Sequence, residues 1–123
     1  MELLYSAKDL ILKGQYKDYT FIIKTNSRYP TAYIKIEKNS IFYLTDYSEI
    51  DLPVHGRLTY GNSLIYDTEA DNYYLGWDYA HFLTENDYVK GAINPGTHKW
   101  TVDEIIECDV IPAIEWLIEQ EGN

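Results

Sequence analysis

The residues that could do chemistry in this sequence gather in two short segments, VHGRLTYG at 54–61 and YLGWDYAHF at 74–82. His55, Asp78 and His81 are all residue types that bind zinc or another divalent ion. Asp78 and His81 are three residues apart, which puts them on opposite faces of a strand. Because the second segment has the composition of a strand, hydrogen bonds to backbone and turns are favoured over joint ligation. A small metal-dependent hydrolase built on these three residues is retained as a third hypothesis.

Covalent catalysis has no motif behind it in this sequence. The HGRLTYG segment is not a GxSxG nucleophile elbow, and the chain contains neither a GxGxxG segment nor a P-loop. The single cysteine, Cys108, lies in an acid-rich tail, where a thiolate is disfavoured. We therefore expect a protein that is not an enzyme and that uses no metal and no cofactor.

Ligand binding is the interpretation that uses both segments. The chain has only two arginines, Arg28 and Arg57. Arg57 follows Gly56, whose missing Cβ lets a ligand approach the backbone, and guanidinium groups match phosphate oxygens in bidentate geometry. Phe82 ends its segment beside a polar run, where an exposed ring can stack on a purine. Two arginines and nearby aromatic rings predict a nucleotide with a pyrophosphate as the ligand.

Several of these residues also have a plainer interpretation. Arg28 is compatible with an exposed arginine in a hairpin turn, and Trp77 with a tryptophan of the hydrophobic core. Asn94 belongs to an Asn-Pro-Gly turn that either closes over a site or merely connects to Trp100. The residues alone leave these alternatives open.

The charge balance of the chain limits its partners. Its 20 acidic and 10 basic residues give a formal charge of -10, and so negative a surface repels long nucleic acids and anionic lipid. A lone cysteine excludes an intramolecular disulfide, and the sequence shows neither a signal peptide nor a run of about 18 apolar residues. We expect a cytoplasmic protein that binds neither long nucleic acid nor membrane. One pocket can still concentrate the few cations around a small anionic ligand.

The elements that must position these residues form an α+β fold, expected as a single domain over residues 1–123 with a sheet core at about 15–90. Ser6 and Asp9 have capping-box spacing and predict a short helix that ends before Gly14. Three runs of β-branched and aromatic residues between 19 and 45 predict antiparallel strands. The segment 54–67 predicts a hairpin around Gly61-Asn62, and 74–82 one more strand. The total is an antiparallel sheet of about five strands.

A change of period marks the C-terminal segment at about 101–121. Thr101 and Glu104 form a second capping box, and apolar residues then recur at helical spacing. Pro112 removes a donor and crowds the preceding turn, so we expect a kink there or two helices that meet. The seven carboxylates from Thr101 onward form a solvated face, while the apolar stripe packs on the sheet.

The two segments, followed by Asp87-Tyr88 and the capped KWTVDEI, resemble a family of small phage and prophage proteins with HGGLTY-like and GWDxAH-like segments. The likeness runs from Tyr47 to Glu119. The chain looks similar to the first-described family of Thoeris anti-defence proteins. In Thoeris immunity a TIR-domain enzyme makes a cyclic ADP-ribose isomer from NAD, and that signal activates an NAD-depleting effector. The family consists of sponges that bind the signal without cleaving it.

This resemblance implies roles for individual residues. Arg28 and Arg57 would contact phosphate or ribose oxygens, Phe82 would stack on the adenine, and His55 and Asp78 would orient the loop. Arg57 stands where an HGGLTY-like segment has its second glycine, so its side chain either serves the ligand or crowds it. The resemblance further implies a homodimer or larger homo-oligomer that binds a signal such as glyco-cyclic ADP-ribose in the cytoplasm of the host bacterium.

A different class of function starts from the acidic C-terminal segment. A protein-interaction inhibitor would present these carboxylates to a basic host defence enzyme or mimic nucleic acid. This hypothesis predicts salt-sensitive binding that is lost when Glu104, Glu107 and Asp109 are neutralised.

Overall fold

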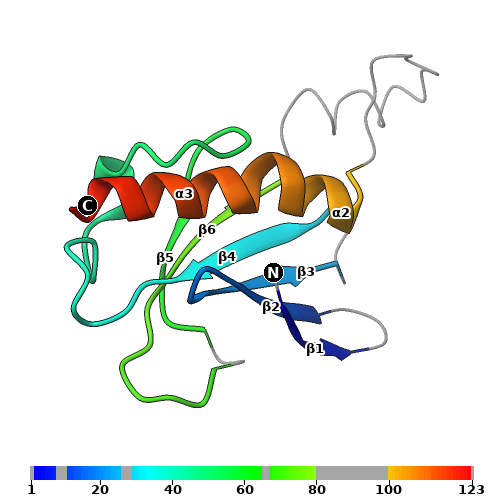
Figure 1. Cartoon of the computed structure of the whole chain (residues 1–123), viewed down its shortest axis with the longest axis horizontal. Helices are drawn as coiled ribbons and strands as arrows, with labels where there is room; N and C mark the ends of the chain where they lie inside the picture. The colour runs from blue at the N-terminus through cyan, green and yellow to red at the C-terminus, as the bar shows by residue number, and fades with distance from the viewer. Residues whose placement is uncertain (1, 8–10, 26–28, 65–66, 80–99, 123) are drawn as a thin grey trace.

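The computed structural model describes residues 2–7, 11–25, 29–64, 67–79 and 100–122. Within these ranges six strands form one antiparallel sheet in the order β1-β2-β3-β4-β6-β5. The strands are β1 (Glu2–Ala7), β2 (Ile11–Tyr16), β3 (Tyr19–Lys24), β4 (Thr31–Lys35), β5 (Tyr60–Asn62) and β6 (Tyr74–Asp78). A C-terminal helical segment crosses one face of the sheet (Figure 1). The expected α+β class with an antiparallel sheet is therefore confirmed.

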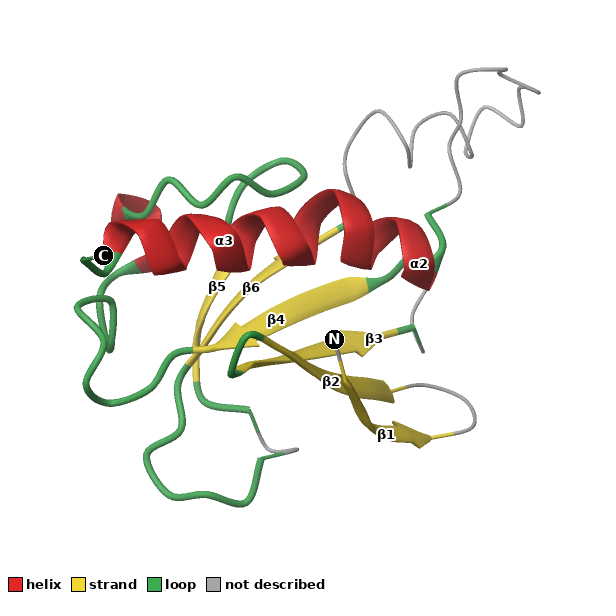
Figure 2. Ribbon diagram, in the orientation of Figure 1, coloured by secondary structure: helices red, strands yellow, loops and turns green. Residues whose placement is uncertain are grey.

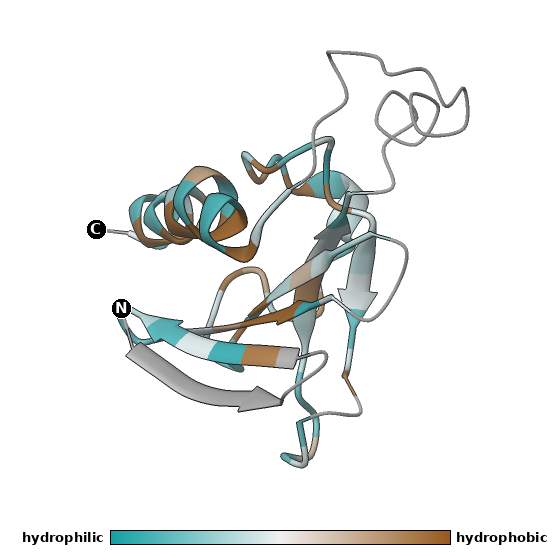
Figure 3. Ribbon diagram, turned by 90° about the vertical axis from the view of Figure 1, so that its right-hand side faces the viewer, coloured by the Kyte–Doolittle hydropathy of each residue, from teal (hydrophilic) through white to brown (hydrophobic). Residues whose placement is uncertain are grey.

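The sheet is two-sided because buried and partly exposed residues alternate along its central strands. In β4, Ala32 and Ile34 are buried toward the helical segment, while Tyr33 and Lys35 point to the opposite face. The brown residues in Figure 3 lie mostly between helix and sheet. On the opposite face a smaller cluster joins Ile22 and Tyr74 to Leu64.

The C-terminal segment consists of α2 (Val102–Ile105), a π-helical turn η2 (Ile106–Val110) and α3 (Ile111–Gln120). The capping box that the sequence predicts at Thr101 and Glu104 is present. Pro112 lies in the first turn of α3, directly after the π-helical turn. Because proline donates no backbone hydrogen bond, the interruption expected at this position takes the form of a change in helical pitch. No helix in the described ranges has the length and apolar character that a membrane crossing requires.

Two predictions of local structure within the first 45 residues were wrong. The region expected to be an N-terminal helix contains the β1–β2 hairpin, in which Ser6 pairs with Leu12 rather than capping a helix. A helix that short is marginal on its own, whereas the hairpin gains pairing with β3. The run at 41–45 is a turn and not a third strand, and Leu44 within it has a positive φ of 62°. Ile41 and Leu44 are exposed there.

The connection from β4 to β5 contains a short 3-10 helix, η1 (Tyr47–Glu49), and passes the C-terminal end of α3 (Figure 2). Glu121 anchors this connection by accepting a hydrogen bond from the Ser40 hydroxyl at 2.8 Å. Phe42 stacks on Trp116 of α3, with ring centroids 5.7 Å apart. The connection therefore has a defined position beside the helix, which matters because it forms one wall of the site described next.

Candidate functional site

The two unusual sequence segments lie side by side in the sheet. β5 pairs with β6 so that Tyr60 faces Gly76 and Gly61 faces Leu75. The hairpin expected around Gly61-Asn62 was wrong, because these two residues lie inside β5 and pair with β6 instead of forming a turn. Pairing with a strand already buried in the sheet outweighs the local turn preference of Asn and Gly.

Residues just outside β5 extend this pairing. The backbone N–H of Thr59 donates to the carbonyl of Gly76 at 2.9 Å. The Thr59 hydroxyl donates to the Asp78 carboxylate at 3.4 Å. Asp78 therefore links the two segments through its side chain.

Close packing in the sheet explains why residue 76 is a glycine. A Cβ at this position would lie 2.5 Å from the Tyr33 ring and 3.1 Å from the carbonyl oxygen of Ala32. The ring of Tyr33 thus lies over the glycine and contacts Tyr60 edge-on at 5.4 Å. Only glycine leaves room for this ring at the centre of the paired segments.

His55 and Gly56 shape the turn that precedes β5. Gly56 has a φ of 72°, which a residue with a side chain rarely adopts. The His55 imidazole stacks on the Tyr79 ring at 4.9 Å with the planes 11° apart, and it contacts Trp100 at the same centroid distance. This stacking holds the turn against the end of β6.

A buried polar network lies beneath this turn. The Trp77 indole donates to the Tyr79 hydroxyl at 2.9 Å, and that hydroxyl donates to the Asp109 carboxylate on the π-helical turn. Asp109 is 6% exposed and Trp77 is 1% exposed. Burial, and then the hydrogen bond to Asp109, raises the pKa of Tyr79 well above its usual value, so the phenol stays protonated. The network connects the motif segment to the C-terminal helix.

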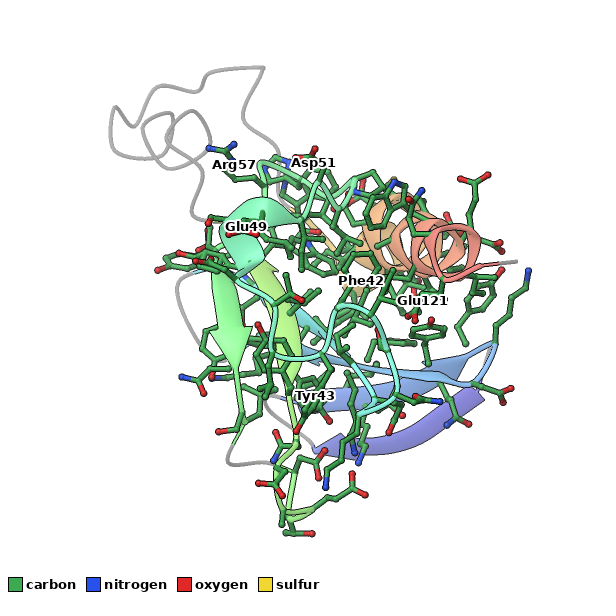
Figure 4. All side chains as sticks on the ribbon, turned by 90° about the vertical axis from the view of Figure 1, so that its left-hand side faces the viewer. Phe42, Tyr43, Glu49, Asp51, Arg57 and Glu121 are labelled. Atoms are coloured by element: carbon green, nitrogen blue, oxygen red, sulfur yellow. The ribbon has the colours of Figure 1, made fainter. Side chains whose placement is uncertain are left out.

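Arg57 lies at the edge of a hollow of about 460 Å³ between the 56–59 turn and the 47–52 segment. Its side chain is exposed and points outward beside Asp51, with Glu49 on the same side (Figure 4). Arg57 makes no ion pair with any other residue that the structure describes. Ser48, Thr59 and the backbone at Gly56 add further polar groups to the wall. The hollow can therefore accept a small ligand that carries negative charge.

The predicted site residues fall into three groups. Arg57 lines the hollow, whereas His55 stacks on Tyr79 and Asp78 accepts from Thr59, and neither His55 nor Asp78 lines it. Trp77 belongs to the hydrophobic core, as its plainer interpretation expected. The predictions for Arg28, His81, Phe82 and Asn94 lie outside the described residues.

Two features of the site were missed from the sequence. Tyr47 lines the hollow from η1, and Asp109 holds Tyr79 from the π-helical turn. A local signal existed only for η1, where Asp46 caps the turn by accepting from the Ser48 N–H at 2.9 Å. The Tyr79 contact joins residues 30 positions apart, which no local pattern reveals.

Metal ligation finds no support in the described ranges, where no group of three His, Cys, Asp or Glu side chains could hold an ion. His81, which the sequence groups with His55 and Asp78 in the metal hypothesis, lies outside these ranges. The chain matches no family model, no curated protein and no solved structure.

Proposed function

We propose that this protein is a phage-encoded immune-evasion protein that binds and sequesters a cyclic ADP-ribose isomer, the signal of TIR-based Thoeris defence, without cleaving it. The observation that carries the proposal is Arg57, an exposed arginine at the edge of a hollow with no ion pair in the described ranges. An arginine in that position is available to phosphate oxygens. The hollow of about 460 Å³ falls in the usual range for small-molecule sites.

The sequence motifs support the same proposal. The HGRLTYG and GWDYAH segments carry the resemblance to phage and prophage proteins, and their described residues Tyr60 and Gly76 face each other in the β5–β6 pairing. The proposed protein is non-enzymatic, acts in the cytoplasm of the host bacterium and assembles as a homodimer or larger homo-oligomer. Light scattering of the purified protein tests the assembly, and a monomer at micromolar concentration contradicts it.

The direct test is isothermal titration with glyco-cyclic ADP-ribose, followed by heat release of the ligand and mass spectrometry. We expect tight binding and recovery of the intact ligand. A cleaved product would identify an enzyme and direct attention to His55 and Asp78. Absence of binding would overturn the proposal.

Arg57→Ala is expected to weaken this binding at least tenfold, as for loss of a charge-assisted hydrogen bond. Lys17→Ala is the matched control, because it removes the same charge from an exposed ion pair with Glu115 at 2.8 Å, on the surface formed by β2 and α3. Equal effects of both substitutions would mean that net charge, not a contact, determines affinity. Arg57→Gly restores the second glycine of an HGGLTY-like segment, and a gain in affinity would show that the arginine crowds the ligand.

The alternative of an acidic interaction inhibitor is less well supported, because several carboxylates of the C-terminal segment have intramolecular partners. Asp109 is buried against Tyr79, Glu104 completes the capping box, and Glu115 pairs with Lys17. Of the three residues whose neutralisation that hypothesis tests, Glu107 is exposed, Glu104 is partly buried and Asp109 is buried. A partner would therefore meet fewer free charges than the sequence indicates.

A further inference from the structure

A second hollow, of about 740 Å³, adjoins the one at Arg57 and shares Tyr47 with it. It lies between the 43–47 connection, β5 and the residues that lead into β6. In Figure 4, Arg57 and Tyr43 mark opposite ends of this face, with Glu49 between them. The η1 turn is thus a partition between two adjacent hollows.

The walls of the second hollow are fixed by hydrogen bonds and close packing. The Tyr43 hydroxyl donates to the carbonyl of Asp71 at 2.6 Å, and the Tyr73 hydroxyl donates to the carbonyl of Thr45. The Tyr43 and Tyr73 rings meet edge-on at 5.8 Å. At Gly61 a Cβ would lie 2.7 Å from the Tyr73 hydroxyl, so a glycine here lets the wall close. The shape is therefore preformed, which lowers the entropic cost of binding.

Arg57 and Asp51 both line the first hollow, whereas the second hollow is more negative. Its described lining contains the carboxylates of Asp46 and Asp71 and the amides of Asn62 and Asn72, and no lysine or arginine, while the Lys38 ammonium outside the lining lies 3.5 Å from the Asp71 carboxylate. Hydrogen bonds from the backbone and hydroxyl of Ser48 hold the pKa of Asp46 below its usual value, so this group is an acceptor at neutral pH. Carboxylates accept from sugar hydroxyls and repel phosphate, while tyrosine faces pack on sugar and base rings.

We propose that the second hollow is the nucleoside subsite of this protein, in which Asp71 and Asn62 bind the sugar hydroxyls of a ligand whose phosphates contact Arg57. The assignment rests on the proposed function, and it adds which part of the nucleotide each hollow binds. A ligand that crosses Tyr47 would place its anionic part at the only described arginine and its hydroxyl groups at the carboxylates.

The test uses two probes, each of which represents one part of the ligand. Adenosine represents the nucleoside, and inorganic pyrophosphate represents the phosphates. Amide chemical shifts report where each probe binds, and titration calorimetry reports the affinity of glyco-cyclic ADP-ribose for each variant. Asp71→Asn keeps the size of the side chain, and asparagine tolerates the positive φ of 60° at this position. Asp103→Asn is the matched control, since Asp103 is exposed on α2 and lines neither hollow.

We expect adenosine to shift the amides of Gly61 and Asn62, and pyrophosphate to shift those around Arg57. Asp71→Asn and Asn62→Ala should each weaken cyclic nucleotide binding about fivefold to tenfold, as for loss of a hydrogen bond. Neither substitution should change pyrophosphate binding, and Asp103→Asn should change nothing.

The outcomes distinguish this inference from the proposed function. If the cyclic nucleotide binds but Asp71→Asn and Asn62→Ala leave its affinity unchanged, the subsite is overturned and the proposed function stands. If the cyclic nucleotide does not bind but adenosine shifts Gly61 and Asn62, the proposed function fails and the nucleoside site stands. If neither molecule binds, both are wrong.

Discussion

Two cations of this protein, Lys35 and Arg57, have opposite surroundings. The Lys35 ammonium contacts Asp67 at 2.9 Å and also Glu69, and its side chain is only 14% exposed. Arg57 is exposed at the edge of a hollow and makes no ion pair in the described ranges. The first cation has its counter-charges built into the fold. The second lies beside Asp51 and Glu49 but forms no ion pair with a described residue.

The different surroundings of Lys35 and Arg57 indicate different roles. Lys35 stabilises the fold, whereas Arg57 is available for binding. Around Lys35, the Tyr74 hydroxyl also donates to Asp67 at 2.8 Å, which holds the 67–72 segment against the sheet. Removing one partner of such a buried cluster leaves the other without compensation. Removing an exposed cation with no intramolecular partner has no such cost. Stability and affinity should therefore respond to different residues.

The largest loss of stability is expected at the buried network beneath the site. Tyr79→Phe removes the hydroxyl that accepts from Trp77 and donates to Asp109, and leaves both groups buried. We expect the free energy of unfolding to fall by about 3 kcal/mol in urea titrations. Tyr16→Phe removes an exposed hydrogen bond to Glu115 and should cost less than about 1 kcal/mol. Equal losses in the two variants would contradict a structural role for the network.

Gly76→Ala tests whether the adjacency of the two motif segments depends on close packing. The new Cβ would overlap the Tyr33 ring, so we expect a loss of about 2 kcal/mol in the free energy of unfolding. Tyr33→Ala should relieve the overlap, so the double variant should be more stable than the sum of the single effects predicts. Strict additivity in this double-mutant cycle would contradict the packing explanation.

The fold was predictable where the signal was local, and unpredictable where distant residues decided the structure. Thr101 and Glu104 form the capping box that the sequence predicts, because the interaction spans three residues. Ser6 and Asp9 have the same spacing, but Ser6 lies in β1, where pairing with Leu12 takes precedence. Spacing alone cannot tell the two cases apart, since only tertiary contacts differ.

The same limit applies to the site. Arg57 was predicted as a site residue because arginine is rare in this chain, and it lines the hollow, whereas His55 and Asp78 were predicted beside it and do not line it. Tyr47 was missed because its place between two hollows depends on β5 and on the residues around Tyr73. Such a wall is assembled from segments far apart in the chain, and no periodicity encodes it.

The Lys35 cluster makes a prediction about pH. Burial raises the pKa of Asp67, but the Glu69 amide, Lys35 and Tyr74 together hold it below the usual 3.8. A carboxyl whose pKa is lower in the folded state stabilises the fold above its unfolded pKa, and this contribution is lost as the pH falls through the folded pKa. We expect Lys35→Met to cost about 1–2 kcal/mol at pH 7 and clearly less at a pH below the lowered pKa that Asp67 has in the folded state, where the carboxyl is protonated. Urea titrations at both pH values measure the difference, and a cost that does not change with pH would contradict it.

The smallest effect on stability is expected for substitution of Arg57. This prediction is the most direct test of the contrast between Arg57 and Lys35. Because the guanidinium has no ion pair in the described ranges, Arg57→Ala should change the free energy of unfolding by less than about 0.5 kcal/mol. Lys35→Met under the same conditions is the contrasting variant, since it removes one positive charge from a position where counter-charges are built in. A loss above about 1 kcal/mol for Arg57→Ala would place this arginine among the stabilising charges and remove the reason for assigning it to a ligand.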